Sequence, residues 1–274
     1  MRTRFFIAAF AALLCAGAWL AVPTAAKSAR PEEAVAPAEL VSAQRGTLPI
    51  ILSAPHGGSV RVEGSKDRKE GVTVKDLRTA EIAWLTSQRL AEKLDGKVYV
   101  VIAQFSRKDA DANRDSDEAY ENKSAAAQYD AYHRALREYV DEVRKAHGGG
   151  LLVDIHGQAR HPDKIMRGTR DGQSVKHLLG EFGREAVTGE DSLFGQMAKQ
   201  GYGVLPALDG DDLKEDMFNG GYITGHYGSQ NKDGVDAIQL EIGSDYRGEE
   251  AMHKTAEDLG DAIAAFAKKY LLKK

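Results

Sequence analysis

Cysteine is nearly absent from this sequence: Cys15 is the only one among 274 residues, and it lies close to the N-terminus. If the first 26 residues are removed as a leader, no disulfide, thiolate metal site or cysteine nucleophile is possible. Any bound metal must then be held by His, Asp or Glu. The chain also lacks a Gly-x-Ser-x-Gly motif, the turn that presents the serine of α/β-hydrolases. Ser53 with a nearby histidine is left as the alternative for metal-free hydrolysis.

Charge of one sign is not in excess either. The formal net charge is -4, which gives no general attraction to nucleic acid or to an anionic membrane surface. We therefore expect no nucleic-acid partner, and membrane contact only through the leader if it is not cleaved. Apolar residues make up 42% and charged residues 28%, which is typical of a soluble domain. About 230 to 250 residues would remain after removal of the leader, enough for one domain.

Residues 1–26 have the pattern of a secretory signal peptide. Two arginines precede an apolar run at 5–22, and the small residues at 23–26 follow, with cleavage expected after them. The protein is therefore expected to be exported, either to the periplasm or as a secreted protein. Two alternatives stay open. One is an uncleaved anchor, because about 18 apolar residues can span a bilayer. The other is a lipoprotein signal at Cys15, although a leucine stands before it in place of the usual small residue.

Residues 27–47 are rich in Ala, Pro, Glu and Ser without periodicity, and we interpret them as a flexible linker before a folded domain at 48–274. Within the domain, short apolar or β-branched runs predict strands at 49–53, 98–103, 151–155 and 237–242. Helical patterns occur at 76–95, 124–146, 174–184, 190–200 and 249–271. This alternation predicts an α/β fold with a mostly parallel sheet covered on both faces, and a site at the carboxyl ends of its strands.

Two histidines directly follow predicted strands. His56 lies in the turn Ser-Ala-Pro-His-Gly-Gly, where the two glycines leave it reachable. His156 follows the strand at 151–155, and Asp154 points to the same face because side chains alternate along a strand. A carboxylate behind a metal-bound histidine fixes its tautomer and raises its basicity. We interpret His56 and His156 as metal ligands.

A hydrolytic zinc site has three protein ligands and an open position for water. Without cysteine, the third ligand must be an acid or another histidine. Glu81 is our choice, since the start of the predicted helix at 76–95 would let it point back at the strand ends. Asp76 is interpreted instead as a helix N-cap. Zinc is the expected metal, although these ligand types suit other divalent ions as well, and geometry is needed to choose.

A polar stretch follows the predicted strand at 98–103 and suits a substrate carboxylate. It contains two arginines and an asparagine, and an arginine presents a planar fork of donors that grips a carboxylate at two points. We therefore expect Arg107 and Arg114 to contact substrate.

The strand predicted at 237–242 carries an acid, Glu241, which must be paired or functional if the strand is buried. Near a metal it could take a proton from the attacking water and give it to the leaving amine. A glycine-rich stretch upstream contains Tyr222 and His226, either of which could close over substrate. Tyr222 is our candidate for substrate binding.

Five stretches, in this order, resemble the N-formylglutamate amidohydrolase family: 53–58, 76–81, 106–114, 154–157 and 239–242. The resemblance covers roughly residues 48–270. It implies a zinc hydrolase related to the metallocarboxypeptidases, with a three-layer α/β/α sandwich around a mixed, mostly parallel sheet. The implied reaction is hydrolysis of an amide bond in an N-acyl amino acid or a (γ-)glutamyl peptide that has a carboxylate.

The resemblance also implies roles for individual residues. The implied metal ligands are His56, Glu81 and His156. The implied catalytic acid and base is Glu241. Substrate would be held at its carboxylate by Asn113 and Arg114, and polarised at its scissile carbonyl by Arg107.

The expected leader bears on the substrate. Breakdown of N-formylglutamate is usually a cytoplasmic task, so a peptide, a γ-glutamyl polymer or another N-acyl amino acid fits an exported member better. Two other hypotheses on function stay open. One is an exported, non-catalytic binding module for amino acids or cell-wall peptides. The other is a cytoplasmic formylglutamate deformylase.

Overall fold

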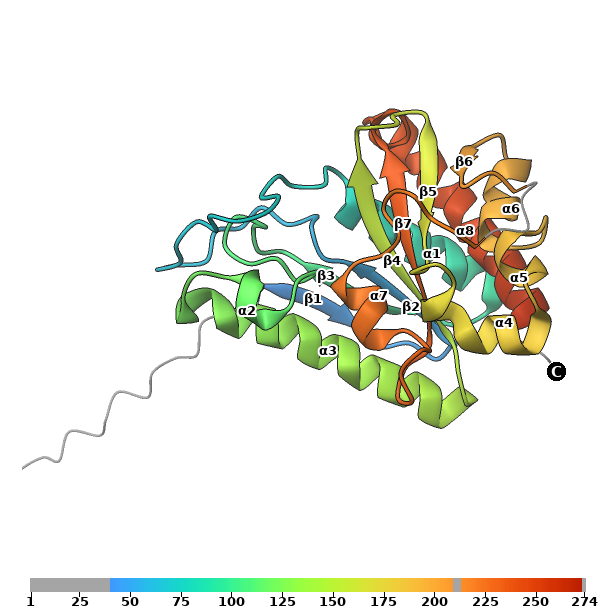
Figure 1. Cartoon of the computed structure of the whole chain (residues 1–274), viewed down its shortest axis with the longest axis horizontal. Coiled ribbons are helices and arrows are strands. Elements are labelled where there is room, and N and C mark those ends of the chain that lie inside the picture. The colour runs from blue at the N-terminus through green and yellow to red at the C-terminus, as the bar shows by residue number, and fades with distance from the viewer. Residues whose placement is uncertain (1–39, 209–212, 273–274) are drawn as a thin grey trace, which may run out of the picture. The chain divides into compact units, whose positions relative to one another are not determined.

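The computed structural model describes residues 40–208 and 213–272 (Figure 1). The expected signal peptide at 1–26, and the expected linker up to residue 39, lie outside the described residues. Among the helices of the described part, none is long and apolar enough to cross a membrane.

Seven strands form one sheet. They are β1 (Val41–Gln44), β2 (Ile50–Ala54), β3 (Tyr99–Ala103), β4 (Leu151–Gln158), β5 (Lys164–Gly168), β6 (Gly203–Leu205) and β7 (Asp236–Gly243). Their order across the sheet is β1-β3-β2-β4-β7-β5-β6. The β2–β3, β2–β4, β4–β7 and β5–β6 pairs are parallel, whereas β1–β3 and β5–β7 are antiparallel. The prediction of a mixed, mostly parallel sheet is confirmed.

Helices pack on both faces of the sheet. They are α1 (Thr79–Leu94), α2 (Ser116–Ala119), α3 (Lys123–His147), α4 (Lys176–Phe182), α5 (Glu185–Thr188), α6 (Leu193–Lys199), α7 (Tyr222–Tyr227) and α8 (Ala251–Tyr270), with 3-10 turns η1 (Gln173–Val175) and η2 (Ser244–Arg247). Side chains alternate between two cores: Leu52 and Val153 pack with α1 and α8, whereas Ile51 and Leu152 pack with α3. Because both faces are covered, β2 and β4 begin with three consecutive apolar residues each, as the sequence predicted.

The expectation that residues 27–47 form a flexible linker is wrong for its last part. Residues 41–44 form β1, which pairs antiparallel with β3 from Val41 opposite Ala103 to Gln44 opposite Val100. As an edge strand with partly exposed side chains, β1 has too few apolar residues to show a strand pattern. The folded part therefore includes residues 40–47.

On the face that α3 covers, the strands change from apolar to polar toward their carboxyl ends. Leu152 is followed on that face by Asp154 and His156 in β4. In β7 the same change leads to Glu241, which lies opposite His156 in the strand register. The predicted position of the site, at the carboxyl ends of the parallel strands, agrees with this arrangement.

Candidate metal centre and active site

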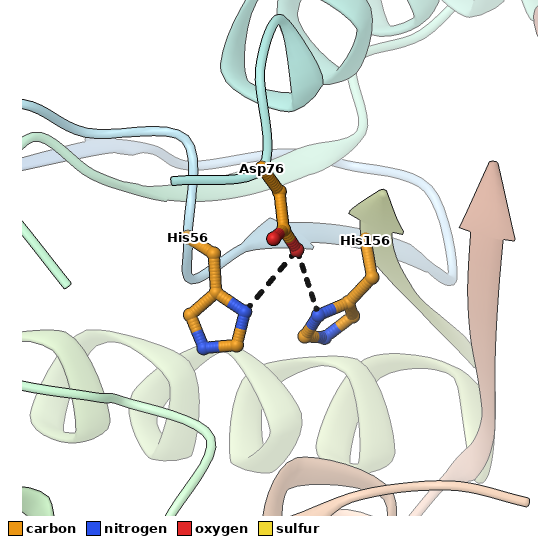
Figure 2. A group of neighbouring side chains, drawn as sticks. All are labelled: His56, Asp76 and His156. Atoms are coloured by element: carbon orange, nitrogen blue, oxygen red, sulfur yellow. Dashed lines mark hydrogen bonds and ion pairs between the residues drawn. The ribbon is translucent and has the colours of Figure 1, made fainter. Parts of the chain in front are cut away.

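Three side chains from separate segments meet at the carboxyl ends of β2 and β4. His56 follows β2, His156 lies in β4, and Asp76 lies in the loop before α1. Nδ1 of each histidine faces Oδ2 of Asp76, at 3.3 Å for His56 and 3.4 Å for His156 (Figure 2). All three side chains are buried, and their ligand atoms lie within 4.8 Å of one another. Two imidazole nitrogens and a carboxylate oxygen match the donor set of hydrolytic zinc sites.

The second nitrogen of each imidazole is held by another buried carboxylate. Nε2 of His56 lies 2.6 Å from Oδ1 of Asp111, and Nε2 of His156 lies 2.8 Å from Oδ2 of Asp154. A neutral ring with its proton on Nε2, donated to the carboxylate, would present the Nδ1 lone pair to a cation bound beside Asp76. Ser53 is fully buried and its hydroxyl donates to Oδ1 of Asp154 at 2.5 Å, so it positions this carboxylate and does not serve as a nucleophile.

Glu81 was predicted to be the third metal ligand, and the structure places Asp76 there instead. α1 begins at Thr79, so Glu81 lies in its first turn, next to the buried Ile82 and Ala83. Its own side chain is exposed and lines a groove of about 900 Å³ that neither histidine lines. The prediction failed because the helix starts three residues later than expected, which leaves Asp76 in the loop that approaches the strand ends.

Charges within the cluster keep its carboxylates ionised. Burial alone would raise the pKa of Asp76, but hydrogen bonds from His156 and His56 outweigh burial and lower it. Burial would likewise raise the pKa of Asp111, but the nearby His56 and the arginines beside it lower it. For His156, burial favours the neutral form, but the charge of Asp154 and its hydrogen bond outweigh burial and raise the pKa well above its ordinary value. Such a site favours an added positive charge.

Arg107 lies where the sequence predicted, beside the metal-site candidates. Its Nε donates to Oδ2 of Asp111 at 3.0 Å, and its Nη1 lies 3.4 Å from Oδ1 of Asp76. Buried Arg68 also reaches Asp111, at 3.4 Å. Neither Asp111 nor Arg68 was predicted. No sequence pattern singles out Asp111, which lies 55 residues from His56 in the chain and meets it only through the fold.

The predicted substrate contacts fall around the same cluster. The amide Nδ2 of Asn113 lies 3.3 Å from Nε2 of His156, and its Oδ1 accepts from the backbone N–H of Ile223, next to Tyr222. Arg114 is 40% exposed and pairs with Glu118 at 3.1 Å. Tyr222 opens α7, a helix the sequence did not predict, and stacks on His226 with ring centroids 5.1 Å apart. Asn113 therefore lies at the histidines, whereas Arg114 lies farther out.

Glu241 is buried in β7, as its strand pattern predicted. Its Oε1 accepts a hydrogen bond from Nε2 of Gln239 at 3.0 Å, which orients the carboxylate. Burial raises the pKa of Glu241, and the carboxylates of Asp76 and Asp154 act in the same direction, against the opposite effect of His156. A buried acid of this kind beside a cluster of metal-ligating groups is typical of a catalytic acid or base.

Sequence comparison finds relatives along most of the chain. Residues 121–246, which include His156 and Glu241, match the family model described as N-formylglutamate amidohydrolase. N-formylglutamate deformylases of Pseudomonas putida and Pseudomonas aeruginosa are 26% and 25% identical to this chain. These matches cover 85% of this chain and 94% and 95% of the two relatives.

Solved structures share the fold. An N-formylglutamate amidohydrolase from Ralstonia eutropha JMP134 is similar with a TM-score of 0.62 and 16% identity, over 85% of this chain and 99% of that chain. A gene product of Agrobacterium tumefaciens has a TM-score of 0.54 and 17% identity, over 85% of this chain and 96% of its own. At these identities the similarity supports the three-layer fold.

The sequence matches define the class of the molecule as an amidohydrolase, an enzyme that acts on carbon–nitrogen bonds. The prediction of an enzyme is thereby confirmed over that of a binding module. Within this class, the findings support the N-formylglutamate amidohydrolase family, whose model matches residues 121–246 and which two N-formylglutamate deformylases resemble over 85% of this chain.

Proposed function

We propose that the protein is a zinc-dependent hydrolase that cleaves the amide bond of an N-acyl amino acid or a (γ-)glutamyl peptide with a free carboxylate. The observation that carries this proposal is the cluster of His56, Asp76 and His156, in which each imidazole is backed by a second buried carboxylate. Zinc is preferred among divalent ions because its hydrolytic sites use this donor set. Bound there, zinc would supply a Lewis acid and lower the pKa of water.

Glu241 is the residue proposed to move the proton. It lies opposite His156 in the sheet, and Gln239 holds its carboxylate in one orientation. In this role it accepts a proton from the attacking water and then delivers it to the departing nitrogen, so that the amine leaves as a neutral group.

Substrate is proposed to bind through groups on the loop that follows β3 and on α7. Arg107, whose Nη1 lies 3.4 Å from Asp76, would polarise the scissile carbonyl. Arg114 and Asn113 would bind the substrate carboxylate, and Tyr222 would cover it. The names of the two Pseudomonas relatives support N-formylglutamate or another acyl glutamate as the substrate class.

We also propose that the protein is exported. The support is the sequence pattern of residues 1–26, with arginines before an apolar run and small residues after it. An exported enzyme would meet extracellular peptides and acyl amino acids, which favours these over N-formylglutamate itself.

The experiment that tests the proposal is hydrolysis of a panel of N-acyl glutamates and γ-glutamyl peptides by zinc-loaded protein, with and without a chelator. Glu241→Gln is expected to lower kcat by about 100- to 10,000-fold, because the proton acceptor is removed. Glu257→Gln, which changes an exposed acid on α8, serves as the matched control and should behave as wild type. Equal activity of the Glu241→Gln variant and the wild type would show that another group moves the proton.

A further inference from the structure

Arg247, at the end of η2, is a buried arginine whose donors reach three separate segments of the chain. Its Nη1 donates to the carbonyl of Leu77 at 2.5 Å and its Nη2 to that of Gln158 at 3.1 Å. Its Nε donates to the carbonyl of Ile242 at 2.9 Å. The side chain is 7% exposed, so solvent contributes little to satisfying it. The buried guanidinium is therefore satisfied by backbone carbonyls.

Each of the three acceptors lies within two residues of a residue of the active site. Leu77 follows Asp76, Ile242 follows Glu241, and Gln158 lies two residues after His156. These segments come from a loop, from β4 and from β7, and they are 80 or more residues apart in the chain. One guanidinium thus touches the backbone of every segment that supplies Asp76, His156 and Glu241.

Gly157 shows how closely the guanidinium is fitted to the site. A Cβ at this position would overlap the carbon and two nitrogens of the Arg247 guanidinium. The backbone N–H of Gly157 also donates to Oδ2 of Asp76 at 3.1 Å, the same oxygen that faces both histidines. Gly157 therefore allows Arg247 and Asp76 to approach β4 from two directions.

A second contact ties the next residue of the same loop to η2. Nη1 of Arg78 donates to the backbone carbonyl of Arg247 at 3.3 Å. Arg78 has φ 63°, in the left-handed region, where α1 begins. The loop that carries Asp76 and η2 are thereby joined by two hydrogen bonds. Arg247 donates to the carbonyl of Leu77, and Arg78 donates to the carbonyl of Arg247.

We infer that Arg247 is a positioning residue: it fixes the backbone segments of Asp76, His156 and Glu241 relative to one another, so that the metal-site atoms and the proposed proton acceptor keep their spacing. This inference rests on the proposed function for its consequence in catalysis. The spatial role itself follows from the three hydrogen bonds. A lysine would keep the charge but has one nitrogen, which cannot span three carbonyls in different directions.

The test begins with hydrogen–deuterium exchange of metal-free protein, wild type beside Arg247→Lys. The matched control is Arg89→Lys, which alters the two-point contact of Arg89 with Asp261 between α1 and α8, away from the site. Arg247→Lys is expected to raise the exchange rates of 76–78, 156–158 and 241–243 together by about tenfold. Arg89→Lys should raise exchange only in α1 and α8.

The second readout is the zinc dissociation constant by chelator competition, together with kcat and KM. Arg247→Lys should weaken zinc binding by about tenfold or more and lower kcat by up to about 100-fold, because small displacements of reacting groups are costly. Gly157→Ala should give the same changes. Gly157→Ala and Arg247→Ala, measured singly and together, should be less than additive, since the overlap of the new Cβ disappears with the guanidinium.

Unchanged exchange in the three segments of Arg247→Lys would overturn the inference, whether or not the protein binds zinc. The inference would also be overturned if the zinc dissociation constant and kcat of Arg247→Lys differed from the wild type no more than those of Arg89→Lys do. If the wild type binds no zinc, but Arg247→Lys still raises exchange in the three segments, the proposed function is contradicted. The positioning role of Arg247 then remains intact.

Discussion

At the scale of single residues, the main feature is that each imidazole of the proposed metal site contacts a buried carboxylate through its second nitrogen, Nε2. Asp111 does this for His56 and Asp154 for His156. Asp154 could be predicted from its alternation with His156 along one strand. Asp111 could not, because it lies 55 residues from His56 in the chain and meets it only through the fold.

Asp111→Asn is expected to weaken metal binding by about 10- to 100-fold, the usual effect of removing a carboxylate behind a metal-bound histidine. Asp109→Asn is the matched control. Asp109 is also fully buried and lies two residues away, but its partners are Arg61, Ser65 and the N–H of Val62. Chelator competition measures both variants. Equal weakening by the two substitutions would show that the effect comes from loop stability and not from the Asp111–His56 contact.

At the scale of elements, the sequence predicted the strands that are buried on both faces and the long amphipathic helices. β2, β3 and β4 contain apolar runs, β7 alternates apolar and polar residues, and α3 and α8 have apolar faces, so their patterns are strong. β5 contains Lys164 and Arg167, and β6 has only three residues, so both escape a search for apolar runs. Their places are set by pairing with β7 and with each other, which the local sequence does not show.

α3 and α7 meet at a histidine that gives the fold a dependence on pH. Nδ1 of His133 lies 2.9 Å from the hydroxyl of Tyr227, and the two rings stack. Burial, reinforced by nearby His226, lowers the pKa of His133 from 6.5 to about 4. Between these values the unfolded chain binds more protons than the folded one, so stability is complete above pH 6.5 and falls as the pH drops toward 4.

Urea unfolding at pH 7 and pH 4 measures this contribution. The wild type should lose about 3 kcal/mol more than His133→Leu over that range, as follows from the size of the pKa shift. His253→Leu, which removes an exposed histidine of α8, should follow the wild type. A His133→Leu variant with the same pH dependence as the wild type would contradict a buried neutral His133.

At the scale of the whole molecule, the described part of the chain is one sheet with helices on both faces, and one face of that sheet turns polar where its parallel strands end. This arrangement brings His56, Asp76, His156 and Glu241 together from segments spread over 186 positions of the sequence. The positions and ends of the central strands could be inferred from the sequence, which is why the two histidines and Glu241 could be singled out. The third ligand depends on where α1 begins, and a shift of three residues there decides between Asp76 and Glu81.

The most direct test of the account is the zinc content of purified, zinc-supplied protein, measured by elemental analysis for the wild type, Asp76→Asn and Glu81→Gln. We expect about one zinc per chain in the wild type and in Glu81→Gln, and a loss of zinc in Asp76→Asn, because Asp76 supplies the third ligand of the proposed site. Zinc retained in Asp76→Asn and lost in Glu81→Gln, or a folded wild type without metal, would contradict it.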